Sequence, residues 1–487
     1  MSAAPASAGS RMLAVAAFVA TYMQGVNISL PNAALPHMQG TLSMADDEIG
    51  WIFTSYITAS MVAMPLTRWL AGRFGRKAVF LSSLLLFVVG LVLDALAKTS
   101  PQLMTARILQ GLASGPLAPL ALAVLQEILP PARHARAGLA ATACGLFGIS
   151  SGPAIGGWLG EHHGWPSIFH FSLPLAGFVF LAVALWLPEK KPEQKPSFDF
   201  LGWASFSLGI VGLQAVLDRG ERLEWFASNE IRIEAIASVL GFYLFIAHIL
   251  TAKQHFLDKA LFRDRNFILS TILAFAAGFV LLPTLALTSP MLEELFGYPV
   301  DTTGYMAIPR GVALVGTLLL AGRAPARFDF RAMAITGMAL VAYANWRMLG
   351  YSPGMDWRPV VTAGALQGAG LGILLPALGR AAFSTLDRKW HPEAGALFNL
   401  SRLYGSTIGI AVVQIFFYGN TQAMHLALAK NLAFRRAAGP ALAMLNDLVT
   451  GQAATVAIID QFKILMLAML VASPFVLFLR KPRPANP

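Results

Sequence analysis

Apolar segments of about twenty residues recur along almost the whole chain, and they constrain its fold more than any other feature. A helix of about 20 apolar residues is long enough to cross the hydrocarbon core of a bilayer. Such segments are expected at 12–35, 50–71, 77–97, 101–126, 135–159, 165–187, 199–218, 231–251, 266–290, 302–322, 331–350, 357–381, 393–419 and 460–480. Only 13% of the 487 residues are charged, whereas a soluble protein carries about a quarter. The sequence therefore predicts an all-α integral membrane protein with about 14 transmembrane helices.

Composition also excludes several classes of protein. Cys144 is the single cysteine, so an internal disulfide and a cysteine-based metal site are excluded. No stretch combines a nucleophile with a base or has the spacing of metal ligands, so we expect neither an enzyme nor a cofactor. The net charge of +11 comes from Lys and Arg in short loops between apolar segments, which indicates membrane topology rather than nucleic-acid binding.

The basic residues are concentrated in one set of alternate loops. They are Arg68, Arg73, Arg76, Lys77, Arg133, Arg136, Lys190, Lys191, Lys195, Lys253, Lys259, Arg263, Arg265, Arg323, Arg327, Arg331, Arg380, Arg388, Lys389, Arg480, Lys481 and Arg483. The other set carries Asp46, Asp47, Glu48, Glu293, Glu294 and Asp301. By the positive-inside rule, the basic loops and both termini are cytoplasmic. Arg11 and the apolar run after it form the first span rather than a cleaved signal peptide, since no cleavage site follows.

The interruptions between spans suggest three parts. Residues 1–187 carry six spans, and 188–265 contain a polar, proline-rich linker at 188–198 followed by two further spans. Residues 266–487 carry the last six spans and include a long, moderately amphipathic external loop at 420–459. This loop either touches the outer membrane surface or a partner, or covers the protein without a special function.

The fifth predicted span has a face made of glycine. Gly148, Gly152 and Gly156 recur every fourth residue and share one side of a helix, with Gly157 beside them. A glycine face lets a second helix approach closely, because no side chain separates the backbones. Pro153 interrupts the helical hydrogen bonds, which a membrane tolerates only where a neighbouring group satisfies the freed carbonyl. Taken alone, this pattern predicts tight packing of two helices.

Charged residues within the predicted spans are candidate functional residues. Arg107 is the strongest of them, because a charge in mid-membrane is costly and normally faces a cavity or a partner. Arg310, in Ile308-Pro-Arg-Gly311, would favour an anionic substrate. Asp94 and Glu127 are the acids in or near the first six spans. Either could titrate, and the alternative for each is an interfacial charge.

Five motifs occur in order along the chain. They are Asn32-Ala-Ala-Leu-Pro-His37; Arg73, Gly75, Arg76 and Lys77 after the second span; Arg107-Ile-Leu-Gln-Gly111; Gly148 to Gly157; and Leu397-Phe-Asn-Leu-Ser-Arg402, which contains Asn399 and is followed by Gly405. Together they resemble the major facilitator superfamily, and in particular its fourteen-span drug:proton antiporters of the EmrB/QacA type.

The resemblance implies two six-helix bundles with two extra central helices, which alternate between inward-open and outward-open states around a central cavity. Spans one, four, nine and twelve would line this cavity with Gln24, Asn27, Arg107, Gln110 and Gln367, and the alternative for each is a hydrogen bond between helices. The arginine that matches Arg107 is implicated in proton movement in the family. Arg402 is expected to pair with carbonyls at a helix end. The glycine face of the fifth span would border span ten, 302–322, as a seal that slides.

The chain also departs from the family pattern. Gly72 replaces the loop aspartate, Arg68 replaces the loop's first glycine, and Asn27 stands where many exporters of cationic drugs have an aspartate. An amide neither carries a proton nor binds a cation strongly, so permanently cationic substrates are disfavoured. Asp94 and Glu127 remain as candidate proton carriers.

The sequence thus favours proton-driven export of hydrophobic or amphiphilic small molecules across the bacterial inner membrane. The expected partners are the lipid bilayer, protons and the substrate, and the resemblance adds a periplasmic adaptor protein and an outer-membrane channel. A proton-coupled metabolite symporter is the alternative among transporters. A transporter-like sensor or assembly subunit without proton coupling is the alternative from another class.

Overall fold

The computed structural model describes residues 8–45, 48–189, 198–252, 258–325, 328–431 and 440–480. Helices account for the regular structure in these ranges, which confirms the predicted all-α fold. Most of the predicted linker, residues 190–197, lies outside the described residues.

The first six predicted spans are helical, and prolines divide several of them. Their helices are α1 (Ala8–Ser29), α2 (Leu35–Leu42), α3 (Trp51–Ala63), α4 (Thr67–Phe74), α5 (Arg76–Leu96), α6 (Ser100–Ser114), α7 (Leu117–Ile128), α8 (His134–His163), α9 (Ser167–His170) and α10 (Ser172–Trp186). Pro65 lies in the short 3-10 turn between α3 and α4, and Pro116 lies between α6 and α7. Proline has no N–H for the helical ladder, so each break falls where that bond is missing.

The next two spans form a helical pair, α11 (Phe200–Arg219) and α12 (Asn229–Thr251). Asp199 and Ser228 cap their first turns by accepting hydrogen bonds from the backbone N–H groups of Gly202 and Glu230. The pair packs closely because a Cβ placed on Gly241 would lie 2.5 Å from the backbone nitrogen of Gly209.

The last six spans are also helical. They are α13 (Arg265–Pro290) with a π-turn at Met291–Leu295, α14 (Val300–Gly322), α15 (Phe330–Met348), α16 (Trp357–Phe383), α17 (His391–Asn431) and α18 (Pro440–Ala472), which a 3-10 turn at Ser473–Phe478 follows. Further 3-10 turns lie at Asn32–Ala34, Pro131–Arg133, Trp225–Ala227, Leu261–Arg263 and Arg388–Trp390. In the part of the chain that the structure describes, 12 helices are long and apolar enough to cross a membrane.

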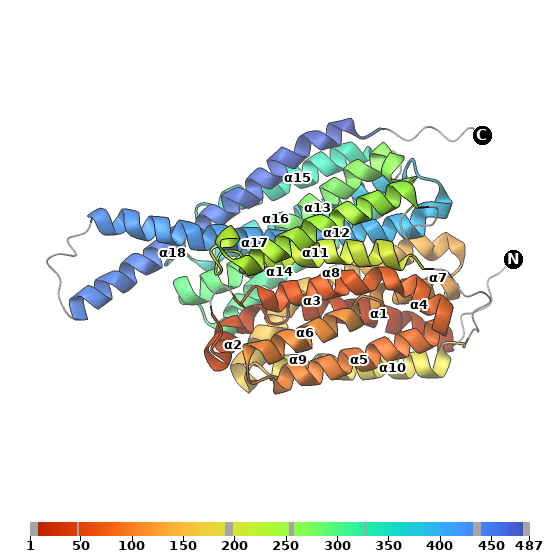
Figure 1. The fold of residues 1–487 in the computed structure, drawn as a ribbon, viewed down its shortest axis with the longest axis horizontal. Helices are drawn as coiled ribbons and strands as arrows, with labels where there is room; N and C mark the ends of the chain where they lie inside the picture. The colour runs from red at the N-terminus through yellow and green to blue at the C-terminus, as the bar shows by residue number, and fades with distance from the viewer. Residues whose placement is uncertain are drawn as a thin grey trace.

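The prediction of a long loop at 420–459 was wrong. Helix α17 continues to Asn431 and α18 begins at Pro440, so most of this stretch is helical. Its alanines and leucines are strong helix formers, while its polar residues lower the hydropathy below that of a membrane span. The apolar window therefore ended before the helix did. Figure 1 shows the two arms projecting beyond the body of the protein.

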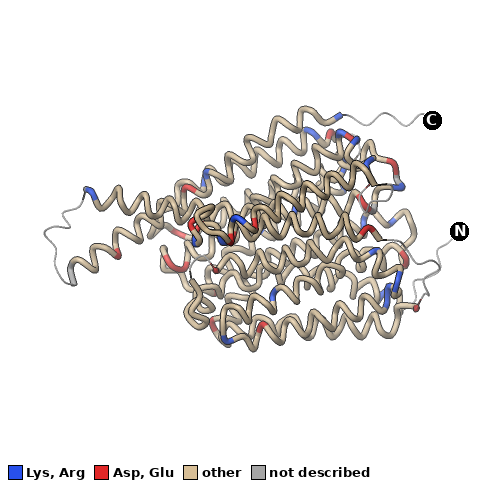
Figure 2. The backbone as a smooth tube through the Cα atoms, viewed as in Figure 1, with Lys and Arg blue, Asp and Glu red and all other residues tan. Residues whose placement is uncertain are grey.

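The long helices run side by side along the molecule, with α3, α5 and α10 in one half and α13, α15 and α18 in the other (Figure 1). The chain begins and ends at one end of this body, and the arms of α17 and α18 project from the other. We call these the basic end and the hairpin end, because Lys and Arg gather mainly at the former (Figure 2).

Both ends of helix α11 form hydrogen bonds with α3 of the first half. At one end the Trp203 indole N–H donates to the Val62 carbonyl at 2.8 Å. At the other the Thr54 hydroxyl donates to the Asp218 carboxylate at 2.7 Å, and the Trp51 indole N–H donates to the Asp218 carbonyl at 3.0 Å. The added pair therefore contacts the first half through specific polar bonds.

Candidate functional site

Arg107 on α6 lies at the centre of a buried polar network in the first half. Its side chain is 0% exposed. Nε donates to the Ile52 carbonyl at 3.1 Å, one Nη donates to the Asn27 carbonyl at 3.0 Å, and the other donates to the side-chain oxygen of Gln110. The guanidinium thus joins α1, α3 and α6 through bonds that offset part of its desolvation.

The network continues through two buried amides that the sequence singled out. Gln110 donates to the side-chain oxygen of Asn27 at 3.3 Å. Asn27 in turn donates to the Met23 carbonyl at 2.8 Å and to the Ser172 hydroxyl of α10 at 2.7 Å. Gln24 of α1 donates to the Ser114 carbonyl of α6 at 3.1 Å. In this conformation all three amides make hydrogen bonds between or within helices.

Two further residues complete the surroundings of Arg107. The guanidinium carbon lies 4.5 Å from the centroid of the Tyr56 ring, within range of a cation–π interaction. Asp94 on α5 is 0% exposed, and its charge interacts with that of Arg107. Neither carboxylate oxygen of Asp94 has a hydrogen-bond partner. A buried carboxylate without hydrogen bonds beside a fixed cation is suited to gain and lose a proton.

Glu127 lies in a different environment. It stands in the last turn of α7 at the basic end, and its carboxylate forms an ion pair with Arg76 at 2.9 Å. The prediction left proton carriage and an interfacial charge open for both acids. The structure distinguishes Asp94, which is buried and interacts with Arg107 through its charge, from Glu127, which links the end of α7 to the start of α5.

The predicted motif Arg73, Gly75, Arg76 and Lys77 spans the junction of α4 and α5. Gly75 joins α4 to α5 with φ = +87°, a conformation that side chains rarely adopt. Arg73 lies in the last turn of α4, and Arg76 and Lys77 begin α5. Arg68, where the family has a glycine, pairs with Glu393 of α17 at 2.9 Å. This ion pair joins the two halves at the basic end.

The glycine face of α8 packs inside the first half, so its predicted position against span ten was wrong for three glycines. A Cβ on Gly148 would lie 2.4 Å from the Tyr22 carbonyl oxygen, and Cβ atoms on Gly152 and Gly156 would collide with Ser29 and Leu30. All three neighbours belong to the first span or its end. Side-chain period alone cannot tell which neighbouring helix such a face meets.

The backbone carbonyl that Pro153 leaves without a helical partner has a hydrogen-bond donor, as the sequence predicts. Its missing N–H frees the Ile149 carbonyl, four residues earlier, and the Ser29 hydroxyl donates to that oxygen at 2.6 Å. The glycine face and the proline therefore serve the same contact between α1 and α8.

The contact between the halves at α8 and α14 uses a different set of small residues. A Cβ on Gly304 would lie 2.5 Å from the Pro153 carbonyl oxygen, and one on Gly311 would lie 2.3 Å from the Ser150 Cβ. Gly157, as expected, faces this boundary and would place a Cβ 2.8 Å from the Val300 carbonyl. The glycines at this boundary thus come mainly from α14.

The motif on α17 packs mainly within the second half, and its Asn399 also contacts Met64 of the first half. Arg402 donates to the side-chain oxygen of Asn399 at 2.8 Å, which is a side-chain partner rather than the helix-end carbonyl that we expected. A Cβ on Gly405 would lie 2.0 Å from the Phe275 carbonyl oxygen, so α13 and α17 approach as closely as α1 and α8 do.

A second buried network surrounds Arg310 on α14, which is 4% exposed. Arg310 donates to the Gln367 side-chain oxygen at 2.8 Å and to the Leu281 carbonyl at 2.7 Å. Gln367 donates to the Thr284 hydroxyl at 2.9 Å and to the Asn345 side-chain oxygen at 3.3 Å. The sequence singled out Arg310 and Gln367 but missed Thr284 and Asn345, which are common polar residues without a charge to mark them.

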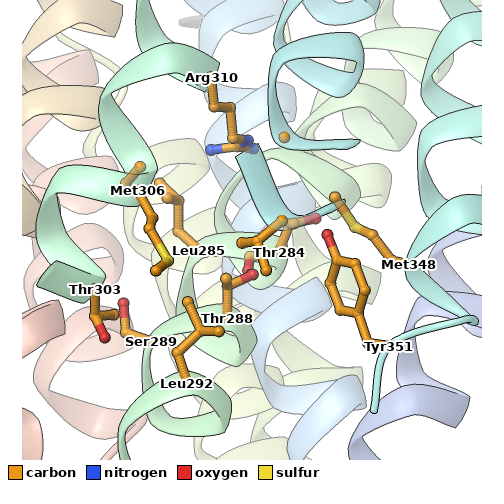
Figure 3. Close-up of a pocket in the computed structure, with 13 residues that line it drawn as sticks. Thr284, Leu285, Thr288, Ser289, Leu292, Thr303, Met306, Arg310, Met348 and Tyr351 are labelled. Carbon is orange, nitrogen blue, oxygen red and sulfur yellow. The ribbon is translucent and has the colours of Figure 1, made fainter. Parts of the chain in front are cut away.

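A small pocket of about 30 Å³ opens beside Arg310. Its walls include Thr284, Leu285, Met306, Met348 and Tyr351 (Figure 3). Burial raises the pKa of the Tyr351 phenol, which follows the end of α15. The hydroxyl therefore keeps its proton and remains able to donate a hydrogen bond.

Comparison with known proteins agrees with this arrangement. The family described as Major Facilitator Superfamily matches residues 14–410. The chain is 28% identical over 418 residues to multidrug export protein EmrB of Escherichia coli (strain K12), with 85% of this chain and 81% of that protein covered. It is 29% identical over 417 residues to fatty acid resistance protein FarB of Neisseria gonorrhoeae, with 85% and 82% covered. It is 27% identical over 400 residues to multidrug resistance protein Stp of Mycobacterium tuberculosis (strain CDC 1551 / Oshkosh), with 82% and 74% covered.

These matches extend over most of the chain and over both halves of the helical fold. Two buried arginine networks lie one in each half, and small residues form the contact between the halves. The chain is therefore a multi-pass membrane protein that belongs to the major facilitator superfamily.

Proposed function

We propose that this protein exports hydrophobic or amphiphilic small molecules across the bacterial inner membrane, driven by the proton gradient. The buried Arg107 network carries the proposal. A charge in mid-membrane is costly, and here it lies near Asp94, whose carboxylate makes no hydrogen bond. A helix bundle that serves only a structural purpose does not require such a pair. The names of the relatives support it, since EmrB is a multidrug export protein and Stp a multidrug resistance protein.

In this mechanism Asp94 is the proton carrier and Arg107 controls it. A proton that enters from outside binds the Asp94 carboxylate and cancels its attraction to the guanidinium. When Arg107 approaches again, its charge favours the ionised acid and the proton leaves on the other side. The hydrogen bonds of Arg107 to Ile52 and Asn27 connect this change to α3 and α1.

Alternating access requires the two halves to separate at one end at a time. At the basic end the Arg68–Glu393 ion pair joins them. Toward the hairpin end Asn32 donates to the Leu285 carbonyl at 2.9 Å and to the Ser289 hydroxyl at 2.8 Å. We assign these two contacts as the inner and outer closures.

The positive-inside rule supports an orientation with the basic end and both termini in the cytoplasm. The arms of α17 and α18 then project into the periplasm. A periplasmic adaptor protein and an outer-membrane channel are the partners that we propose there. Residues 432–439, including Arg435 and Arg436, lie outside the described residues.

The test is a drug-susceptibility panel in an efflux-deficient host. Wild-type protein should raise resistance to several amphiphilic compounds, and a protonophore or Arg107→Ala should remove most of it. Thr105→Ala is a matched control, since Thr105 lies on the same helix but is exposed on its outer side. Resistance equal to that of the empty host for every compound, with normal protein levels, would refute export.

A further inference from the structure

The pocket beside Arg310 lies within the second half, between α13, α14, α16 and the end of α15. In Figure 3 the Arg310 guanidinium, Thr284 and the Tyr351 hydroxyl lie toward one end of it, while Thr303, Ser289 and Leu292 lie toward the other. Its apolar wall comes from Leu285, Met306 and Met348.

Three buried polar atoms on the wall of this pocket have no hydrogen-bond partner. They are one Nη of Arg310, the hydroxyl of Tyr351 and the hydroxyl of Thr303. All three can donate a hydrogen bond. A buried donor without a partner is unfavourable, and more so when it is charged. Three such donors around one pocket indicate that a ligand rich in acceptor atoms completes them.

The two halves differ in how they compensate the buried cation. A Cβ on Gly111 would lie 2.3 Å from the Tyr56 carbonyl oxygen, and a Cβ on Gly368 would lie 2.1 Å from the Arg310 carbonyl oxygen. Four residues later, Gly115 meets Ser60 and Gly372 meets Leu314 in the same way. Arg310 thus occupies the position that Tyr56 has in the first half, and Gly364 replaces Arg107.

The counter-charge is not repeated. Asp94, on the third span of the first half, acts on Arg107. The third span of the second half instead brings the neutral Asn345 to Gln367. Among the described residues, Arg310 is bonded to an amide and a backbone carbonyl, and no acid forms an ion pair with it. Glu293 follows the pocket residue Leu292 but does not line the pocket. Its charge interacts with those of Glu294 and Glu161.

We propose that this pocket binds the anionic headgroup of an amphiphile, with its carboxylate on Arg310 and Tyr351 and its hydrocarbon part along Leu285, Met306 and Met348. The inference rests on the proposed export function and names a substrate class for it. The ligand supplies the negative charge that Asp94 supplies in the other half. A buried, uncompensated charge is strongly unfavourable, and a bound anion removes that cost.

Equilibrium binding to purified protein in phosphatidylcholine nanodiscs tests the proposal without relying on transport. The probes are decanoate, decan-1-ol and decyltrimethylammonium, which share a chain length and differ in charge. Decanoate should bind at least about tenfold more tightly than decan-1-ol, as expected for hydrogen bonds to a charged group. Equal affinities of the wild-type protein for decanoate and decan-1-ol would overturn the proposal.

Variants locate the binding. Arg310→Gln should abolish the preference for decanoate, and Arg310→Lys should retain part of it. Asn345→Asp should also abolish it, because the new carboxylate supplies the counter-charge while still accepting the bond from Gln367. A preference that survives in both Arg310→Gln and Asn345→Asp would overturn the assignment. If Arg310→Gln fails to fold, Asn345→Asp and the wild-type probes decide it.

A lipid headgroup could supply the same anion, so a second series adds phosphatidylglycerol to the nanodiscs. Competition with decanoate would identify a lipid phosphate as an occupant, and unchanged decanoate affinity would assign the site to a soluble carboxylate. Both results support an anion site. Failure of the proposed function is seen separately, in the susceptibility panel with Arg107→Ala.

Discussion

The guanidinium of Arg107 lies over the ring of Tyr56, at 4.5 Å from the ring centroid, and both side chains are almost completely buried. Arg107 comes from α6 and Tyr56 from α3, so the pair connects the fourth span to the second. This cation–π interaction does not require a carboxylate. It therefore stabilises the guanidinium over the Tyr56 ring in this conformation.

Two substitutions of Tyr56 should separate the contribution of its aromatic face from that of its hydroxyl. Tyr56→Phe keeps the π system and should retain most transport. Tyr56→Leu removes a buried cation–π interaction of about 2 kcal/mol, which should lower both thermal stability and transport. The check is efflux of a fluorescent substrate alongside the melting temperature in detergent. Equal losses in the two variants would show that the hydroxyl, rather than the ring, matters.

Asp94→Asn should abolish proton coupling without unfolding the protein. The amide cannot release a proton, and it leaves the buried Arg107 guanidinium without its counter-charge. Proton uptake into vesicles on substrate addition should therefore disappear, and the melting temperature should fall. Glu127→Gln is the comparison, because Glu127 pairs with Arg76 at the basic end. Normal coupling in Asp94→Asn would remove Asp94 as the proton carrier.

A methyl group added at the boundary between the halves should impair transport. In Gly304→Ala the new Cβ would lie 2.5 Å from the Pro153 carbonyl oxygen and 2.8 Å from the Ala154 Cα, so backbone must move. Overpacking of this kind costs about 1–3 kcal/mol. Gly316→Ala, on the same helix with nothing within 4 Å, should transport normally. Measured efflux that is alike in the two variants would contradict a functional contact between α8 and α14.

The ion pair between Arg68 and Glu393 should act on the balance of conformations rather than on folding. The Arg68 side chain is 82% exposed, and exposed pairs contribute only about 0.2–1 kcal/mol. Glu393→Ala should therefore open the basic end more often with little change in melting temperature. Spin labels across α4 and α17, in a Cys144→Ser background, would report the distance. The double variant Arg68→Glu with Glu393→Arg should restore the wild-type distribution.

The fold was largely predictable because hydropathy marks each membrane span directly. The fourteen predicted segments all coincide with helices in the described residues, and the order of motifs identified the family. The end of α17 was missed because Ala and Leu continue a helix after the chain has become too polar for a membrane. Helix propensity, rather than hydropathy, was the informative signal at 420–459.

The candidate site was predictable only where a residue is unusual for its place. Arg107 and Arg310 stood out because charges are rare within spans, and both are buried in polar networks. Asn345 and Tyr351 could not be singled out, since an amide within a helix and a phenol just after a helix both have many uses. The direction of the glycine face in α8 depends on which helix is its neighbour, and periodicity contains no information about that.

Helix α17 also gives the protein a lever. It runs without interruption for 41 residues, from the turn that carries Glu393 to the arm at the hairpin end. At 1.5 Å per residue it is about 60 Å long, so a tilt of about 10° at one end displaces the other by roughly 10 Å. A rearrangement at the basic end would thus produce a larger displacement at the end of the α17 arm.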